Sequence, residues 1–318
     1  ATGEDLFTPF EGRMDAQLAL ASIAGIRGSG HDQDNETVVH EPSYGQINYY
    51  SPVLLALARF YRRPLYQYLA SWDRTVGAVQ QSRYITDNGE WMLFDWGGYA
   101  YAWYDPGVQA AVDQDAPLSF AFPSVNEAHL RASYEPRGMV AGMRRRAVVI
   151  HAGGRPVYAD LVDSHHPPAE VTEVALDDDG QRARLTCRGA ADSGFTRQAI
   201  VLRRPSRLTL SRYTDAEQAW WCYGSPQRQG NALRWEDGTT LTVKTGAIVS
   251  LEATGYHDEK VVGMGLLRLK DPLPMVYPLM RAQPEDGRIV IEVLGIDVEV
   301  VVRVLRVEEQ EAACVAIA

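Results

Sequence analysis

Apolar residues recur at helical spacing in the first third of the chain. Residues 14–26 carry leucine and isoleucine at this spacing among alanines. Ser51 and Pro52 are typical of a helix start, because serine caps a first turn and proline suits the first helical position. The pattern therefore predicts helices over 14–26, 51–61 and 65–81.

From about residue 117, short runs rich in β-branched residues alternate with turn signals. Strand runs that follow a helical block favour separate α and β layers over βαβ units. We predict an α+β fold, in which a helical domain over 1–116 carries the site and a large antiparallel β-sandwich spans 117–318. The segments in which we expect strands are 147–162, 170–189, 197–214, 239–254 and 287–308.

Composition limits the kinds of binding partner and the cellular location that we expect. The chain has 318 residues and a formal net charge of −10, which argues against nucleic acid because that partner requires a basic footprint. Arginine groups at 62–63, 144–146 and 203–207 are interpreted as solvated charge on helix and strand faces. The sequence contains no apolar run of about 18 residues, so we expect no membrane partner. No signal peptide is visible, and we expect a secreted or periplasmic protein rather than a cytoplasmic one.

Several common chemistries lack their motifs. There is no Gly-x-Ser-x-Gly, no Walker A loop and no dinucleotide glycine fingerprint. Cys187, Cys222 and Cys314 show no disulfide framework, although one pair could bridge. We expect no cofactor, and a structural divalent metal is left open. Two polar loops hold ligand types without zinc or calcium spacing: His31, Asp32, Asp34 and Glu36, and separately Asp160, Asp163, His165 and His166.

The stretch 31–50 concentrates groups that can move protons, just before the helix that starts at Ser51. A tyrosine is protonated at neutral pH and can act as an acid, whereas as a base it needs a cationic neighbour. Packing of these tyrosines between helices is the alternative interpretation. The candidate residues of this stretch are Asn35, His40, Glu41, Tyr44, Tyr49 and Tyr50.

An aromatic run from Trp91 to Tyr104 follows, with glycines and acids between the rings. Sugar rings pack their C–H faces on aromatic side chains, so this run favours a partly open carbohydrate groove. A helix–sheet interface rich in aromatics would look similar. The substrate-binding residues that we predict here are Arg83, Trp91, Trp96, Tyr99 and Tyr101.

The segment HEPSYGQINYYSPVLLALARFY, His40 to Tyr61, resembles heparinase II/III-like polysaccharide lyases, the group that includes the oligoalginate lyases. In that group a Glu, a Pro and paired tyrosines open a helix of an (α/α) toroid. RRRAVVIHAGGRPVYADLVDSHH and RLTLSRYT look like the C-terminal sandwich of the group. The resemblance implies a partial (α/α)-toroid-type domain followed by the sandwich, since residues 1–116 are too few for a whole toroid.

The resemblance also implies a reaction. Such lyases cleave a uronic acid by β-elimination, in which the carboxylate is neutralised, a base removes the C5 proton and an acid protonates O4. Tyr44 would be the acid or base, with His40 and Asn35 neutralising the carboxylate or assisting the base. The expected partner is an acidic polysaccharide or oligosaccharide, and an N-terminal partner chain or a homo-oligomer would complete the toroid. A histidine from the sandwich would close the site: His151, His165 or His166.

Two other functions fit the same sequence. A non-catalytic carbohydrate-binding or assembly subunit would use the helical part as an interface. A glycoside hydrolase would use a pair of carboxylates whose separation depends on the stereochemistry of the reaction. Its candidates are Glu41, Asp87, Glu90 and Asp95.

Overall fold

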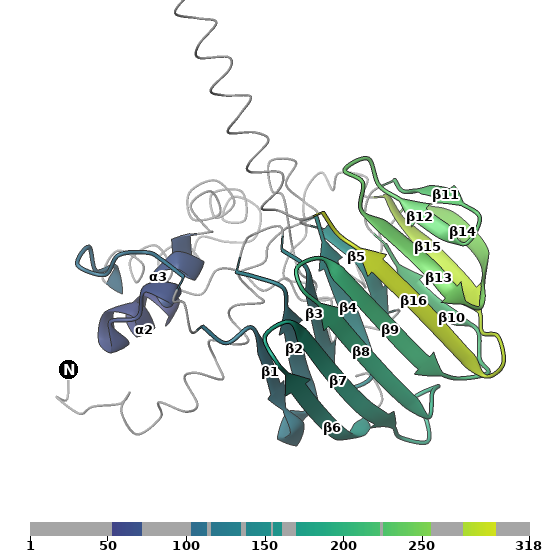
Figure 1. Ribbon diagram of the computed structural model, residues 1–318, viewed down its shortest axis with the longest axis horizontal. Coiled ribbons are helices and arrows are strands. Elements are labelled where there is room, and N and C mark those ends of the chain that lie inside the picture. The colour runs from purple at the N-terminus through teal and green to yellow at the C-terminus, as the bar shows by residue number, and fades with distance from the viewer. Residues whose placement is uncertain are drawn as a thin grey trace, which may run out of the picture.

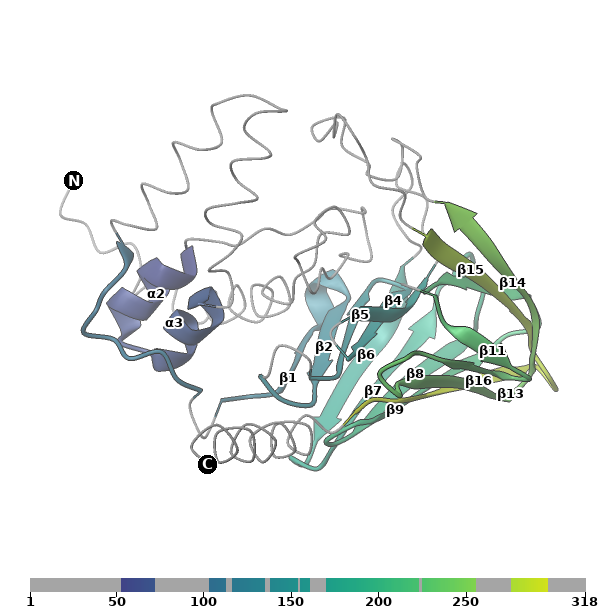
Figure 2. The same cartoon turned by 90° about the horizontal axis from the view of Figure 1, so that it is seen from above.

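Two β-sheets pack face to face, and a pair of short helices lies beside one edge of this sandwich (Figure 1 and Figure 2). The predicted antiparallel β-sandwich is confirmed. The toroid and the domain boundary near residue 116 stay predictions. The computed structural model describes residues 53–71, 103–112, 116–134, 138–153, 155–160, 170–222, 225–255 and 276–296.

The helix pair consists of α2 (Val53–Tyr61) and α3 (Pro64–Ser71). Arg62 ends α2 with a φ of 56°, in the left-handed region, and Pro64 opens α3 where a missing N–H costs no hydrogen bond. The helix predicted over 51–61 is confirmed from residue 53 and that over 65–81 as far as residue 71, whereas 14–26 and 72–81 lie outside the described residues. Neither helix is long and apolar enough to cross a membrane.

A hydrophobic cluster joins the helices to the sandwich. Apolar residues of α2 and α3 pack there against Val108 and against Tyr134, which lies just beyond the second strand. The Tyr134 hydroxyl donates to the carbonyl of Pro117 at 2.5 Å. Arg62 donates to the Asp105 carboxylate at 2.5 Å. The end of the second strand is therefore in direct contact with the helical part.

The first sheet contains eight strands in the order β1-β2-β3-β4-β5-β10-β15-β14. Neighbouring strands are antiparallel; β1 to β5 form a meander, and three strands from later in the chain extend it. The strands are β1 (Ser119–Phe122), β2 (Glu127–Arg131), β3 (Val140–Arg144), β4 (Ala147–Ala152), β5 (Arg155–Asp160), β10 (Gln218–Trp221), β14 (Ala247–Gly255) and β15 (Val276–Gln283). A 3₁₀ turn, η3 (Pro123–Val125), links β1 to β2.

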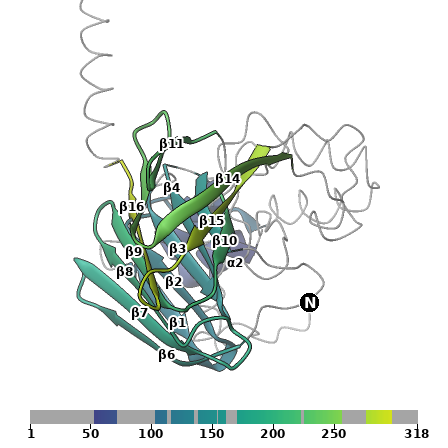
Figure 3. The same cartoon turned by 90° about the vertical axis from the view of Figure 1, so that its right-hand side faces the viewer.

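The second sheet also contains eight strands, in the order β11-β12-β13-β16-β9-β8-β7-β6. Its neighbours are antiparallel throughout, and Figure 3 shows β6 to β9 and β16 on the side of the sandwich away from α2. The strands are β6 (Val171–Asp178), β7 (Arg182–Gly189), β8 (Arg197–Arg203), β9 (Arg207–Tyr213), β11 (Gln227–Gln229), β12 (Ala232–Arg234), β13 (Thr240–Thr245) and β16 (Arg288–Leu294).

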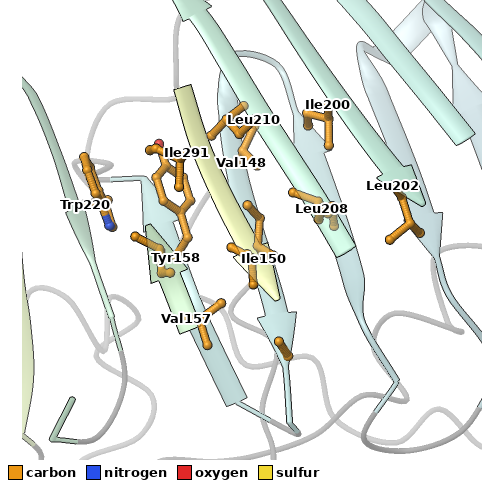
Figure 4. Packing of buried hydrophobic residues seen from close by; sticks show 14 of the residues in the cluster. Val148, Ile150, Val157, Tyr158, Ile200, Leu202, Leu208, Leu210, Trp220 and Ile291 are labelled. Atoms are coloured by element: carbon orange, nitrogen blue, oxygen red, sulfur yellow. The ribbon is translucent and has the colours of Figure 1, made fainter. Parts of the chain in front are cut away.

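The core lies between the two sheets, because each strand turns alternate side chains inward. β8 shows this directly, since its even-numbered residues are buried and its two end arginines are exposed. The Tyr158 and Trp220 rings stack with their centroids 5.1 Å apart. Figure 4 shows side chains from both sheets meeting in this layer.

A buried ion pair crosses this layer. Arg212 of β9, in the second sheet, reaches Asp160 of β5, in the first sheet, and their side chains are only 3% and 4% exposed. Arg212 also donates to the Tyr158 hydroxyl at 2.8 Å and to Oε1 of Gln198 at 2.5 Å. The Asp160 carboxylate accepts the backbone N–H of Val148 at 2.7 Å. Burial alone would lower the pKa of the Arg212 guanidinium, but the carboxylate raises it above its ordinary value.

A second ion pair closes the edge of the sandwich where β1 and β2 meet β6. Arg204 binds the Asp178 carboxylate through two 2.7 Å contacts and donates to the carbonyl of Arg131 at 3.1 Å. Its side chain is only 8% exposed, so the interpretation of the 203–207 group as solvated charge is wrong for Arg204. Burial would raise the pKa of Asp178, but hydrogen bonds from Arg204, Ser119 and the Gly180 N–H lower it to about 2.

We expect Arg212→Met to destabilise the fold by about 3–5 kcal/mol, because it leaves a buried carboxylate without its counter-ion. Urea unfolding followed by circular dichroism measures the change. The matched control is Arg188→Met, which removes an exposed arginine paired with Glu173 and should cost less than about 1 kcal/mol. Equal losses in the two variants would contradict a structural role for the buried pair.

We expect Asp178→Asn to make the stability of the fold depend less steeply on pH in the acid range. The folded pKa of Asp178, about 2, lies below its ordinary value of 3.8, so its contribution is complete above pH 3.8 and is lost as the pH falls toward 2. Unfolding midpoints at pH 6, 4, 3 and 2 should therefore fall more steeply in the unsubstituted protein. Parallel curves would show that Arg204 does not stabilise this carboxylate.

Candidate functional site

Ionisable side chains occupy the outer face of the first sheet, next to the helix pair. On β2, Ala128 and Leu130 point into the core, so Glu127, His129 and Arg131 point the other way. These three side chains are nevertheless buried, with exposed fractions of 7%, 8% and 2%. Buried ionisable groups require partners or a functional reason.

His129 lacks such partners. Neither ring nitrogen has a hydrogen-bond partner, although both are buried. The ring lies close over Gly142 of β3, with Nδ1 3.4 Å from where a Cβ at that residue would lie. Burial, and secondarily the charge of Arg131, lowers the pKa of His129 from 6.5 to about 3. The imidazole is therefore neutral at physiological pH.

Arg131 supplies a positive charge two residues further along the same face. Its guanidinium carbon lies 5.0 Å from the centroid of the Tyr134 ring. Burial lowers its pKa to about 10, against the opposing influence of the phenols of Tyr134 and Tyr68. It therefore stays cationic at neutral pH. Because Tyr68 belongs to α3, this end of β2 faces the helical part.

His151 of β4 is the predicted sandwich histidine that the structure describes. It is 1% exposed and pairs with Val140 of β3, which pairs in turn with Arg131. Neighbouring strands lie about 4.8 Å apart, so Arg131 and His151 flank Val140 on one face of the sheet. The structure thus brings His151 to the face that holds His129.

The other predicted site residues lie outside the described residues and stay predictions. Of the aromatic run, only its last two residues are described. Trp103 packs against the helical cluster, as the interface alternative expects, and Tyr104 is 56% exposed. The residues outside are Asn35, His40, Glu41, Tyr44, Tyr49, Tyr50, Arg83, Asp87, Glu90, Trp91, Asp95, Trp96, Tyr99, Tyr101, His165 and His166.

Sequence reasoning missed Glu127, His129 and Arg131. Their signal was present, because an ionisable residue at every second position of a strand places all three on one face. The segment was too short to stand out against the longer strand runs. What only the structure adds is that the face is covered and lies beside the helices.

Metal and thiol chemistry find little support in the described residues. No group of three or more His, Cys, Asp or Glu side chains there could hold a metal ion. Asp160 of the second polar loop is engaged by Arg212. Cys187 and Cys222 are free thiols, and burial raises their pKa values to about 11 and about 12, so neither is an activated nucleophile.

No protein-family model matches the chain, and no curated protein matches it. Solved structures do. One is a heparinase III with methylated lysines, at 10% identity and a TM-score of 0.50, with 91% of this chain and 47% of that chain covered. Another is heparan sulfate lyase HepC from Pedobacter heparinus, at 12% identity and a TM-score of 0.42, with 74% and 41% covered.

The present chain spans less than half the length of these structures. At such low identity, the likeness concerns the fold and not the chemistry. The match to the first of them extends over nine-tenths of this chain. The fold of this protein is therefore related to the heparinase III fold.

Proposed function

We propose that this chain is part of a polysaccharide lyase that cleaves a uronic-acid-containing glycan by β-elimination. The observation that carries the proposal is the neutral, unpartnered His129 beside the cationic Arg131. They lie on the sheet face that meets the helical part, in a fold related to heparinase III. In this proposal the active site combines this face with the acid–base residues predicted in the stretch 31–50.

The chemistry of elimination matches these groups. A uronate carboxylate near Arg131 is neutralised, which makes the C5 proton more acidic. A base removes that proton, the C4–O4 bond breaks as the C4–C5 double bond forms, and an acid protonates the departing O4. Tyr44 is the acid or base, and His40 and Asn35 assist it. A carboxylate next to His129 raises the low pKa of this imidazole, so that it becomes a better proton acceptor.

The remaining parts of the site come from outside this chain segment. Since the chain spans less than half of the heparinase structures, a further N-terminal portion, a partner chain or a second copy completes the toroid. A partial (α/α) toroid precedes the sandwich. An acidic polysaccharide as substrate agrees with a secreted or periplasmic location.

We expect the full natural protein to release a product with the ultraviolet absorbance of an unsaturated uronide from one of four glycans: heparan sulfate, alginate, polygalacturonate or hyaluronate. Tyr44→Phe should lower this rate by about 10²-fold or more, because it removes the hydroxyl that carries the proton. Its thermal unfolding should match that of the unsubstituted protein, since one hydroxyl is lost.

The outcomes separate the alternatives. New reducing ends without the chromophore would identify a hydrolase, and binding without either signal would identify a non-catalytic subunit. A fully active Tyr44→Phe variant would show that the acid–base residue is elsewhere.

For His129 we expect two effects of His129→Gln, which keeps a polar side chain of similar size. Elimination should fall by about tenfold or more if the imidazole takes part in proton transfer. Because the folded pKa, about 3, lies below the ordinary 6.5, the unsubstituted protein loses stability as the pH falls below 6.5. Between pH 7 and 4.5 it should lose about 2 kcal/mol more than the variant in urea unfolding. A changed pH profile of stability with unchanged elimination would leave His129 a purely structural residue.

A further inference from the structure

A row of cationic side chains lies on the outer face of the second sheet. This is the side of the sandwich opposite to the face that holds His129 and Arg131. Strand register aligns Arg188 of β7, Arg197 of β8, Tyr213 of β9 and Arg288 of β16 across four neighbouring strands. The guanidinium carbons of Arg197 and Arg288 lie 5.8 Å and 5.3 Å from the centroid of the Tyr213 ring. These strands lie side by side in Figure 3.

Two acidic residues, Glu173 and Asp177, lie beside this row. Glu173 contacts Arg188 at 2.8 Å, but both side chains are more than 60% exposed, so water screens the pair. Asp177 pairs in register with Arg184, yet no carboxylate of the described residues lies within ion-pair distance of Arg184 or Arg197. Such a local excess of cations is notable in a chain with a net charge of −10.

A groove of about 470 Å³ lies over β6, β7 and β8, at the end of the row formed by Arg188 and Arg197. It begins where the pairing of β6 with β7 shifts between Thr172 and Ala175, and Glu173 there has a φ of 52°. The bulge disrupts the regular pairing of this edge strand with β7 at that end of the groove. Three arginines line the groove, Arg184, Arg188 and Arg197, together with the acidic residues Glu173 and Asp177. Its volume is in the range of small-ligand sites.

The geometry points to an anionic ligand rather than to nucleobases or to the apolar faces of sugar rings. Arg197 and Arg288 come from the strands on either side of β9, so both approach the Tyr213 ring and leave it a poor stacking platform. Guanidinium groups instead present paired donors to sulfate or carboxylate. A nucleic-acid surface would require stacking rings or a basic chain overall, and this chain provides neither here.

We propose that this groove is a second binding site for an acidic polysaccharide, separate from the site of elimination. Arg184, Arg188 and Arg197 bind sulfate or carboxylate groups of the glycan, and Tyr213 with Arg288 holds the end of the row in place. The identity of the ligand class rests on the proposed function, whereas the site itself rests on the arginine row and the groove. Such a site retains a long chain on the enzyme between cleavage events.

The test compares two double variants of the full natural protein, Arg188→Gln/Arg197→Gln and Arg182→Gln/Arg203→Gln. Each pair is aligned in register across β7 and β8 on the same outer face, and each removes two positive charges. The pairs lie six residues apart along β8, roughly 20 Å at about 3.3 Å per residue. The second pair is therefore a control for net charge. Circular dichroism and thermal unfolding confirm that both variants fold.

Binding is measured by calorimetry with heparin oligosaccharides and with polygalacturonate, at 50 and 200 mM salt. We expect the groove variant to bind about tenfold more weakly and the control variant less than about twofold more weakly. The salt dependence should also decrease only in the groove variant. Equal affinities in all three proteins, or equal losses in both variants, would overturn the site.

Two further measurements separate this inference from the proposed function. Elimination by the unsubstituted protein is assayed on the same glycans: binding at the groove without elimination would overturn the lyase and uphold the site. Elimination without any groove-dependent binding would uphold the lyase and overturn the second binding site. A 20-nucleotide DNA duplex serves as a competing polyanion, and equally tight, equally groove-dependent binding of DNA would overturn selectivity for acidic glycans.

Discussion

The sandwich depends on one buried contact between its two sheets, the pair of Arg212 and Asp160. A guanidinium in a dry layer is tolerated only if its donors are met, and here Tyr158, Gln198 and the carboxylate meet them. Asp160 comes from the first sheet and Arg212 from the second, so the network forms only when β5 and β9 lie in one relative position. It therefore fixes how the two sheets are stacked in a way that interchangeable apolar side chains do not. Arg204 forms a second contact between the sheets at the β1–β6 edge. It binds Asp178 of the second sheet and the carbonyl at the end of β2 in the first sheet.

With the inner layer fixed, the strand alternation assigns every other side chain to an outer face, and the two outer faces differ in chemistry. The first sheet turns His129, Arg131 and His151 toward the helical side, under cover and with His129 uncharged. The second sheet turns exposed arginines to the solvent. Covered groups with altered pKa values suit proton transfer, whereas exposed guanidiniums suit the holding of an anionic polymer. Under the two proposals above, one sandwich would provide surfaces for two different tasks on a single substrate class.

Local sequence patterns predicted much of this fold. The alternation in 170–189 and 197–214 gives four strands that lie next to one another, because hairpin neighbours pair locally. The sequence did not reveal that β10, β15 and β14 extend the first sheet beyond β5, since that pairing depends on contacts far apart in the chain. It also misplaced Arg204, because an arginine that binds a carboxylate of its own sheet and a carbonyl of the other sheet has the same local pattern as a solvated one. The predicted site residues of 31–50 and 83–101 lie outside the described residues, so His151 alone of the strand-borne candidates was located.

His129 differs from a structural histidine in its hydrogen bonding, not in its burial. A buried imidazole whose two nitrogens donate and accept hydrogen bonds is a structural residue, because these bonds replace the ones it made to water. His129 has both nitrogens buried and unpartnered, which costs about 1–3 kcal/mol for each unmet group. Apolar side chains of similar size would fill the same space over Gly142 without that cost. The free energy spent on a neutral imidazole beside a fixed cation is explained if an anionic ligand supplies the missing partner, and a uronate carboxylate is such a ligand.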